Sequence, residues 1–285
     1  MKKVEQTQSL SSSNKVYYVL KVLHLAPCNP EGESRYDEDF RQRIEREVKE
    51  MERDSYNRRD DVTVKSISNG ELSKAPRQLK NRKAPGSDGI TNEHLKNIGP
   101  ITKRAILLLF NSMIWLEHVP SEYKKGVIIP IPKGGGKDAS IKDNNRGITL
   151  LSCVYKLFES ILLTRLDGWL RDRGVIHELQ GAFQEKCSCQ HTSTILQETI
   201  QHNRERGSTV YVVFLDVRKA FDTVWTDGLL YRLYNIGMEG KLWRLLRDCY
   251  GGFRYSVLVN GHTSMDFKVG RGVHQGAPMS MRLYQ

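Results

Sequence analysis

Thr209–Leu215 is the segment that most constrains what this chain folds into, because its seven residues are almost all β-branched, aromatic or aliphatic and a carboxylate, Asp216, follows at once. A run of this kind predicts a strand buried on both faces. A carboxylate at the end of such a strand is costly unless it is hydrated, paired or metal-bound. Asp216 is therefore a candidate ligand for a hard cation such as Mg²⁺, and an ordinary turn aspartate is an equally good interpretation. Asp222 is better interpreted as a helix cap.

The neighbouring segments predict an α+β fold. Val127–Pro132 predicts an extended edge strand, because its prolines exclude both a helix and a central strand. Asn260-Gly261, between Arg254–Val259 and a strand ending near Val269, predicts a hairpin with a type I′ turn. Apolar periodicity predicts helices at 35–53, 103–116, 157–170, 190–204, 225–234 and 240–250. Together these elements predict an α+β fold with one antiparallel sheet.

Charge is unevenly distributed along the 285 residues. The chain has 44 Lys and Arg against 33 Asp and Glu, a formal net charge of +11. Residues 1–75 hold 14 basic and 14 acidic residues, so the whole excess lies in residues 76–285. An excess of this sign favours a polyanionic partner, most simply nucleic acid, although ordinary solubility charge explains it about as well. Asn69-Gly70 marks a turn and places a boundary near residues 70–75.

Several classes of protein are disfavoured. The longest apolar run, Ala105–Phe110, is far too short to span a membrane. The five cysteines are scattered, and Cys187-x-Cys189 is too closely spaced for a zinc knuckle, which predicts free thiols in a reducing, intracellular compartment. The sequence has no H-x-x-x-H pair, G-x-S-x-G or P-loop, which disfavours a zinc hydrolase, an α/β-hydrolase and a P-loop NTPase.

Three further segments are candidate binding sites. Gly270–Pro278 has three glycines that let backbone approach a ligand closely, and its Gln275 can hydrogen-bond a nucleotide. Lys83–Ile90 predicts a tight turn between basic flanks. Lys133 and Arg146 flank a Gly-Gly-Gly tip and are placed to bind phosphates. Plain turn chemistry explains each of these segments equally well in isolation.

In order and spacing, these segments resemble the reverse transcriptase of non-LTR (LINE-like) retrotransposons. The similarity covers roughly residues 76–285, and the blocks that carry it are Lys83–Ile90, Gly126–Lys133, Asn145–Leu151, Val154–Arg165, Phe214–Val224 and Gly272–Ser280. The resemblance implies a right-hand polymerase: fingers in residues 76–208 and part of the palm in 209–285, after an N-terminal helical extension of residues 1–75. Gly147, His274 and Ala277 depart from the family pattern, which commonly has Pro, Arg and Cys there.

The resemblance also implies roles for the residues of the last two blocks. Asp216 would hold the catalytic Mg²⁺ ions, and the backbone carbonyl of Val217 would face the second ion. Phe221 matches the aromatic residue that packs under the nucleotide sugar and excludes a ribose 2′-hydroxyl. Gln275 and Gly276 would contact the incoming dNTP and the template base.

Basic residues would bind the polyanionic ligands. Lys133 and Arg146 would lie near the triphosphate, and the residues expected to contact nucleic acid are Lys83, Lys137 and Arg271. The implied partners are an RNA template, a DNA primer and dNTPs, with no membrane. The family further implies a nuclear or ribonucleoprotein location.

Two-metal phosphoryl transfer needs several carboxylates. In the family, the second and third come from a Tyr/Phe-Ala-Asp-Asp segment downstream of the Gln-Gly segment, and the 285 residues contain none. Asp60-Asp61 lies in the polar N-terminal region without that context. We therefore expect a truncated reverse transcriptase that does not polymerise alone. The alternatives are a non-catalytic nucleic-acid-binding remnant and an unstable fragment of a retroelement protein.

Overall fold

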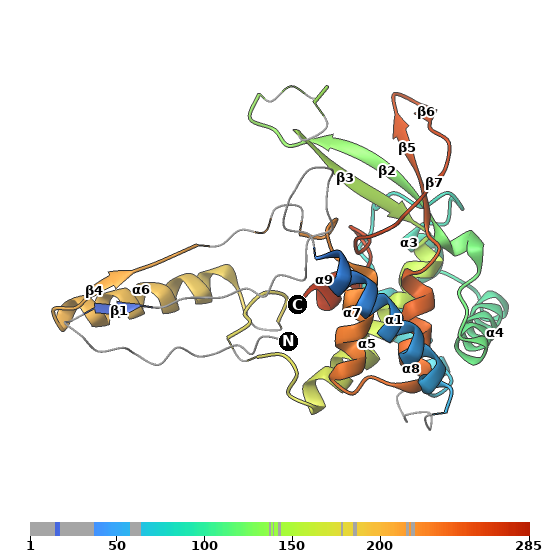
Figure 1. The fold of residues 1–285 in the computed structure, drawn as a ribbon. Coiled ribbons are helices and arrows are strands. Elements are labelled where there is room, and N and C mark those ends of the chain that lie inside the picture. The colour runs from blue at the N-terminus through green and yellow to red at the C-terminus, as the bar shows by residue number, and fades with distance from the viewer. Residues whose placement is uncertain are drawn as a thin grey trace. The chain divides into compact units, whose positions relative to one another are not determined.

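The chain divides into two compact units, whose elements are labelled in Figure 1. The computed structural model describes residues 15–17, 37–57, 64–136, 138, 140–141, 144–177, 179–184, 187–214, 217 and 220–285. The first unit joins Met1–Leu25 to Ile176–Ala220, and the second joins Ala26–Val175 to Phe221–Gln285.

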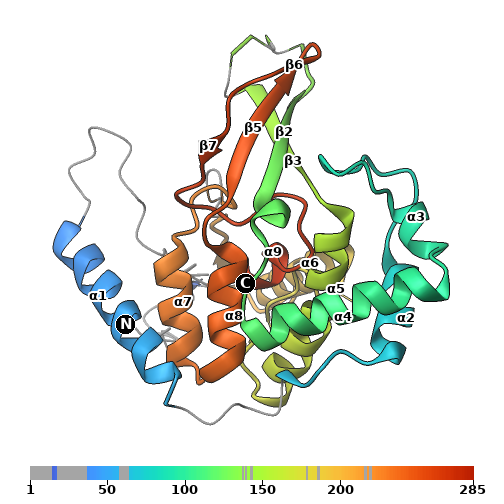
Figure 2. The ribbon, with the colours of Figure 1, turned by 90° about the vertical axis from the view of Figure 1, so that its right-hand side faces the viewer.

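The second unit is built on a mixed sheet, whose long strands lie side by side above its helices in Figure 2. The strands are β2 (Lys125–Pro132), β3 (Asn145–Leu151), β5 (Arg254–Val259), β6 (His262–Thr263) and β7 (Phe267–Lys268). Their order is β3-β2-β5-β6, and β7 also pairs with β5. Every pair is antiparallel except β2 with β5, which is parallel. The α+β class is confirmed, with one parallel pair that the sequence did not predict.

The prediction that Val127–Pro132 is an edge strand is wrong, because β2 is paired on both sides. Residues Lys125–Ile128 pair with β5 on one side, while Gly126–Pro132 pair with β3 on the other. Pro130 and Pro132 lie beyond the part that β5 covers, so no ladder bond is lost on that side. The prolines therefore limit the length of the β2–β5 pairing rather than excluding β2 from the sheet interior.

The predicted hairpin turn is confirmed. Asn260 and Gly261, between β5 and β6, have φ angles of 50° and 79°. Positive φ at both central residues is the signature of a type I′ turn, and its twist matches the twist of the flanking strands.

Among the described helices of this unit, α5 supplies the largest number of fully buried side chains. These helices are α1 (Glu38–Ser55), α2 (Asn69–Gln78), α3 (Asn92–Lys96), α4 (Pro100–Leu116), the 3₁₀ helix η2 (Ser121–Lys124), α5 (Cys153–Asp172), α7 (Thr226–Asn235), α8 (Gly240–Tyr250) and α9 (Ser280–Tyr284). Leu157, Phe158, Leu162 and Leu166 of α5 have no exposed surface. The Phe158 ring lies 5.1 Å from that of Phe110 in α4.

Helix α1 belongs to this unit although it lies in the predicted N-terminal extension. Its predicted apolar stripe is confirmed by the burial of Ile44 and Val48. Figure 2 shows α1 beside α7 and α8, and Tyr234 of α7 donates a 2.5 Å hydrogen bond to Asp54 of α1. The boundaries at residues 75 and 208 were predicted from the functional regions of the family, and they stay predictions.

The first unit contains β1 (Lys15–Tyr17), α6 (Cys189–Glu205) and β4 (Thr209–Tyr211), with β1 parallel to β4. The prediction that this strand is buried on both faces is wrong for the described residues: Tyr211, Val213 and Phe214 are 45%, 57% and 82% exposed. Two strands and α6, which buries none of its own side chains, present too little apolar surface to cover β4. Asp216 lies outside the described residues.

None of the helices in the described part of the chain has both the length and the apolar character needed to cross a membrane.

Candidate functional site

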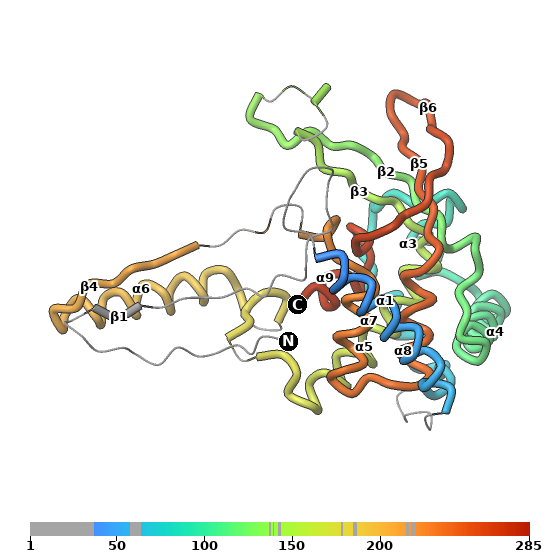
Figure 3. The backbone as a smooth tube through the Cα atoms, in the orientation of Figure 1, coloured from blue at the N-terminus to red at the C-terminus, as the bar shows by residue number. Residues whose placement is uncertain are grey.

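The loop Gly270–Met279, between β7 and α9, lies against the turn Phe221–Val224, and its path can be followed in Figure 3. Gly272 N donates to the carbonyl oxygen of Val224 at 2.8 Å, and Val273 N donates to that of Phe221 at 2.9 Å. Gly272 has a φ of 95°, and a Cβ there would lie 3.1 Å from the Phe221 carbonyl oxygen. This contact therefore requires glycine for both conformation and space.

The same loop also meets the free edge of β3. Thr149 N donates to the carbonyl oxygen of Gln275 at 3.3 Å. Gly276 has a φ of 115°, and a Cβ there would lie 3.2 Å from the Thr149 carbonyl oxygen. The structure thus places the predicted residues Phe221, Gln275 and Gly276 in two segments that contact each other, although more than fifty residues separate Phe221 from Gln275 in the sequence.

His274 holds this loop from inside the protein. Its side chain is buried, its ring stacks on Tyr250 at a centroid distance of 5.0 Å, and the Phe253 centroid lies 3.8 Å away. The Tyr255 hydroxyl contacts His274 Nδ1. Burial lowers the pKa of His274 from 6.5 to about 3, so the ring is neutral. This aromatic cluster was not predicted from the sequence; the available signal was the pair Phe253 and Tyr255, two residues apart at the start of β5.

A buried carboxyl group, also missed, lies in the core of the same unit. Glu159 of α5 has no exposed surface, and neither carboxylate oxygen has a hydrogen-bond partner among the described residues. Burial raises the pKa of Glu159 from 4.5 to about 8. The Tyr155 hydroxyl donates to the Cys249 carbonyl oxygen at 3.0 Å instead of to Glu159, and the positive charge of Lys156 offsets only part of that rise. Glu159 is therefore mainly protonated at neutral pH.

The predicted phosphate-binding residues Lys133 and Arg146 lie at the far end of the β2–β3 hairpin. Lys133 N donates to the Asn144 carbonyl oxygen at 2.9 Å, Arg146 pairs with Ile131, and both predicted residues are exposed. Arg146 precedes Thr149 by three residues, which is about 10 Å along a strand and places it on the opposite face. The structure therefore does not bring these two residues to Gln275.

The remaining predicted residues are scattered. The loop Lys83–Ile90 packs on the start of α5, since a Cβ on Gly86 would lie 2.6 Å from Ser152 N. Lys83 and Arg271 are exposed, and Val217, in the first unit, is half-buried. Asp216 and Lys137 lie outside the described residues. The described residues contain no group of three His, Cys, Asp or Glu side chains placed to hold a metal ion.

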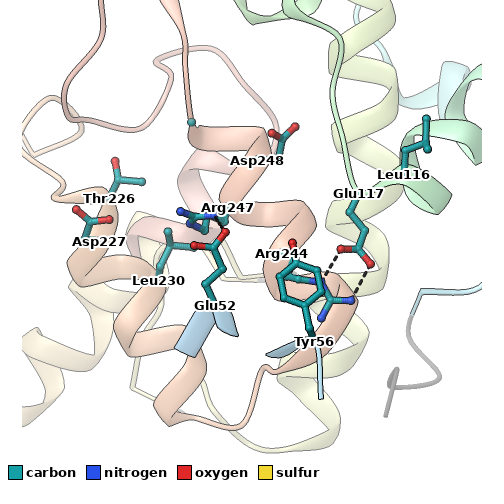
Figure 4. A pocket seen from close by; sticks show the side chains of 11 residues that line it. Glu52, Tyr56, Leu116, Glu117, Thr226, Asp227, Leu230, Arg244, Arg247 and Asp248 are labelled. Carbon is teal, nitrogen blue, oxygen red and sulfur yellow. Dashed lines mark hydrogen bonds and ion pairs between the residues drawn. The ribbon is translucent and has the colours of Figure 1, made fainter. Parts of the chain in front are cut away.

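A cavity of about 500 Å³ lies apart from these residues, among α1, α7, α8 and the end of α4 (Figure 4). Arg244 binds both carboxylate oxygens of Glu117, at 2.5 and 2.7 Å, and Arg247 is paired with Glu52. Asp227, whose pKa is raised by burial, also lines it. Because its guanidinium groups are already bound to carboxylates, we assign no ligand to this cavity.

Comparison with known proteins gives the family. The model of the reverse transcriptase (RNA-dependent DNA polymerase) family matches residues 131–285. The chain belongs to the reverse transcriptase family. The match includes Phe221, Gln275 and Gly276, and ends where the described chain ends.

Relatives of this reverse transcriptase chain come from mobile elements. It is 30% identical over 207 residues to the probable RNA-directed DNA polymerase from transposon X-element of Drosophila melanogaster, covering 72% of this chain and 22% of that relative. It is 29% identical over 226 residues to that from transposon BS of the same species, covering 78% and 24%. It is 30% identical over 203 residues to the Pol polyprotein of retrotransposable element R2 of Popillia japonica, covering 70% and 27%. The resemblance to non-LTR retrotransposon reverse transcriptases is confirmed, and the chain spans about a quarter of these relatives' length.

Proposed function

We propose that this chain is the nucleotide-binding part of an RNA-directed DNA polymerase. The observation that carries the proposal is the direct backbone contact between the Phe221 turn and the Gly272–Gly276 loop. Family resemblance gives both segments a role at the incoming dNTP. Phe221 lies under the sugar and rejects a 2′-hydroxyl, while Gln275 and Gly276 contact the nucleotide and the template base.

The glycine geometry supports this role for the loop. Gly272 and Gly276 bring backbone within van der Waals distance of two other segments, so the loop is held from the Phe221 side and from β3. A site held from both sides keeps its shape before the ligand arrives, which lowers the entropic cost of binding. His274 directly precedes Gln275, and its buried, neutral ring anchors the loop there without adding a charge.

The nucleic-acid partners are proposed as an RNA template and a DNA primer. The excess of 11 positive charges and the exposure of Lys83 and Arg271 support phosphate contacts, to which Lys137 is also assigned. Lys133 and Arg146 remain proposed triphosphate contacts at the hairpin tip. We assign the fingers to residues 76–208 and part of the palm to 209–285. A reducing, intracellular setting, nuclear or ribonucleoprotein-bound, follows from the family alone.

Reverse transcriptases use metal ions, and Mg²⁺ is the proposed one, with Asp216 and the Val217 carbonyl as its ligands. The described residues hold no group of three His, Cys, Asp or Glu side chains that could bind a metal ion, and Asp216 lies outside them, so the proposed metal site is limited to these two ligands. What the described residues supply is the shape of the nucleotide pocket.

A gel-based extension assay and a binding assay test the proposal together. The 285-residue polypeptide is incubated with an RNA template, a DNA primer and dNTPs, with Asp216→Ala as the control. We expect dNTP and RNA–DNA hybrid binding without primer extension. Extension that Asp216→Ala abolishes would overturn the expected inactivity, while absence of any dNTP binding would overturn the nucleotide site. Hybrid binding with a steep salt dependence but no dNTP binding would favour a nucleic-acid-binding protein without catalysis.

A further inference from the structure

We propose that Tyr284 is a positioning residue for Phe221 and thereby for discrimination between deoxyribose and ribose in the nucleotide. This inference rests on the proposed function, because it takes Phe221 as the residue that meets the sugar. It adds a residue outside the Phe221 and Gln-Gly segments to the nucleotide pocket.

The contact is between the two rings. The ring centroids of Phe221 and Tyr284 lie 5.2 Å apart, with an angle of 37° between the ring planes. This distance lies within the range of interacting aromatic pairs. The backbone of Phe221 is held by Val273 N, which donates to its carbonyl oxygen, but that bond does not fix the side-chain torsions. Tyr284 restricts the ring itself.

Helix α9 is anchored well enough to act as a support. Arg282 Nε lies 2.5 Å from Asp167 Oδ1 of α5, and the Arg282 side chain is only 12% exposed. Met279, the N-cap residue of α9, and Leu283 are also buried. The Arg282–Asp167 pair therefore ties the helix that carries Tyr284 to α5, a helix of the hydrophobic core.

The consequence is specificity for the sugar. A ring that excludes a 2′-hydroxyl acts by steric contact, so it discriminates only if it cannot turn aside. Without the Tyr284 ring beside it, Phe221 gains rotamers that open space at the 2′ position. Removal of Tyr284 should then relax the choice of sugar while leaving the Gln275 contacts in place, because those depend on the Thr149 and Gly272 bonds.

The test measures the ratio of the dissociation constants of an rNTP and the matching dNTP. The 285-residue chain is used with Mg²⁺, an RNA template and a DNA primer ended by a dideoxynucleotide. Tyr284→Ala is expected to lower the ratio about two- to tenfold, the range that corresponds to one aromatic pair. Tyr284→Phe keeps the ring and should retain the wild-type ratio. Tyr231→Ala, a half-buried tyrosine on α7, is the matched control and should leave the ratio unchanged.

Phe221→Ala separates the inference from the proposed function. If Phe221→Ala lowers the ratio and Tyr284→Ala does not, the inference is wrong and the proposed function stands. If neither changes the ratio, or the wild-type chain binds no dNTP, the proposed function is wrong and the inference fails with it.

A spectroscopic measurement needs no nucleotide. In ¹⁹F NMR of the chain labelled with 4-fluorophenylalanine, Phe221→Leu identifies the Phe221 resonance. Tyr284→Ala should shift this resonance, and Tyr231→Ala should not; an unmoved resonance refutes the positioning role. Tyr284→Leu replaces Tyr284→Ala in both measurements if the alanine variant fails to fold.

Discussion

Glu159→Gln should stabilise this protein at neutral pH, by an amount that follows from burial of the carboxyl group. In the folded chain Glu159 has no exposed surface, and its pKa is raised to about 8. In the unfolded chain the carboxyl has its ordinary pKa of 4.5. Between these two values the unfolded state has released the proton and the folded state has kept it.

The sign follows from this difference in bound protons. Because the folded pKa of an acid is raised, the wild-type protein loses stability as pH rises from 4.5 towards 8 and loses no more above that. Each pH unit corresponds to about 1.4 kcal/mol, so the loss at pH 7 is about 3 kcal/mol relative to pH 4.5. Glutamine cannot titrate, and Glu159→Gln removes this loss.

The assay is urea unfolding of both proteins at several pH values between 4.5 and 8. The free-energy difference between the variant and the wild type should rise by about 3 kcal/mol from pH 4.5 to 7. His274 titrates in both proteins, so its effect cancels in the difference. Glu50→Gln, at an exposed position on α1, is the control for replacing a carboxyl group by an amide at the surface. A pH-independent difference for Glu159→Gln would show that the carboxyl is ionised or paired in the folded state.

Three further predictions follow from other contacts. His274→Phe keeps a ring in the aromatic cluster but cannot take up a proton. Because burial lowers the pKa of His274 from 6.5 to about 3, the wild type should lose about 2 kcal/mol of stability relative to this variant as pH falls from 7 to 5 in the same unfolding assay. Equal losses in both proteins would contradict a buried, neutral histidine. Gly272→Ala should destabilise the folded chain by about 1–3 kcal/mol and weaken dNTP binding, because the φ of Gly272 is 95° and an added Cβ would meet the Phe221 carbonyl oxygen. Gly168→Ala, with open space around it in α5, should cause no loss of stability in a thermal melt. Arg244→Ala should lower the free energy of unfolding by about 3 kcal/mol in a urea titration, because it leaves Glu117, only 17% exposed, without its cation. Arg43→Ala, which breaks a surface pair with Glu47, should lower it by less than about 1 kcal/mol. Similar losses for the two variants would refute the argument from burial.

The sequence by itself determined the local elements and the chemical identity of the segments. The helix stripe of Ile44 and Val48 and the turn Asn260-Gly261 follow from periodicity and from backbone preferences, which act within a few residues. The order of the motifs was enough to indicate the reverse transcriptase family, because each motif is a run of consecutive residues that can be recognised without knowing the fold. The candidate residues Phe221, Gln275 and Gly276 were all named on that basis.

Only the tertiary structure decided which of those segments meet and which side chains are buried. The contact of Phe221 with the Gly272 loop and with Tyr284 joins residues far apart in the chain, and no local preference specifies it. Glu159 has the polarity of a surface residue, yet packing around α5 removes it from water and moves its pKa. The apolar run that begins at Thr209 looked buried, but burial depends on what covers a strand, and among the described residues too little covers β4. Sequence periodicity reports what a segment can bury; the amount that it does bury is set by partners from elsewhere in the chain.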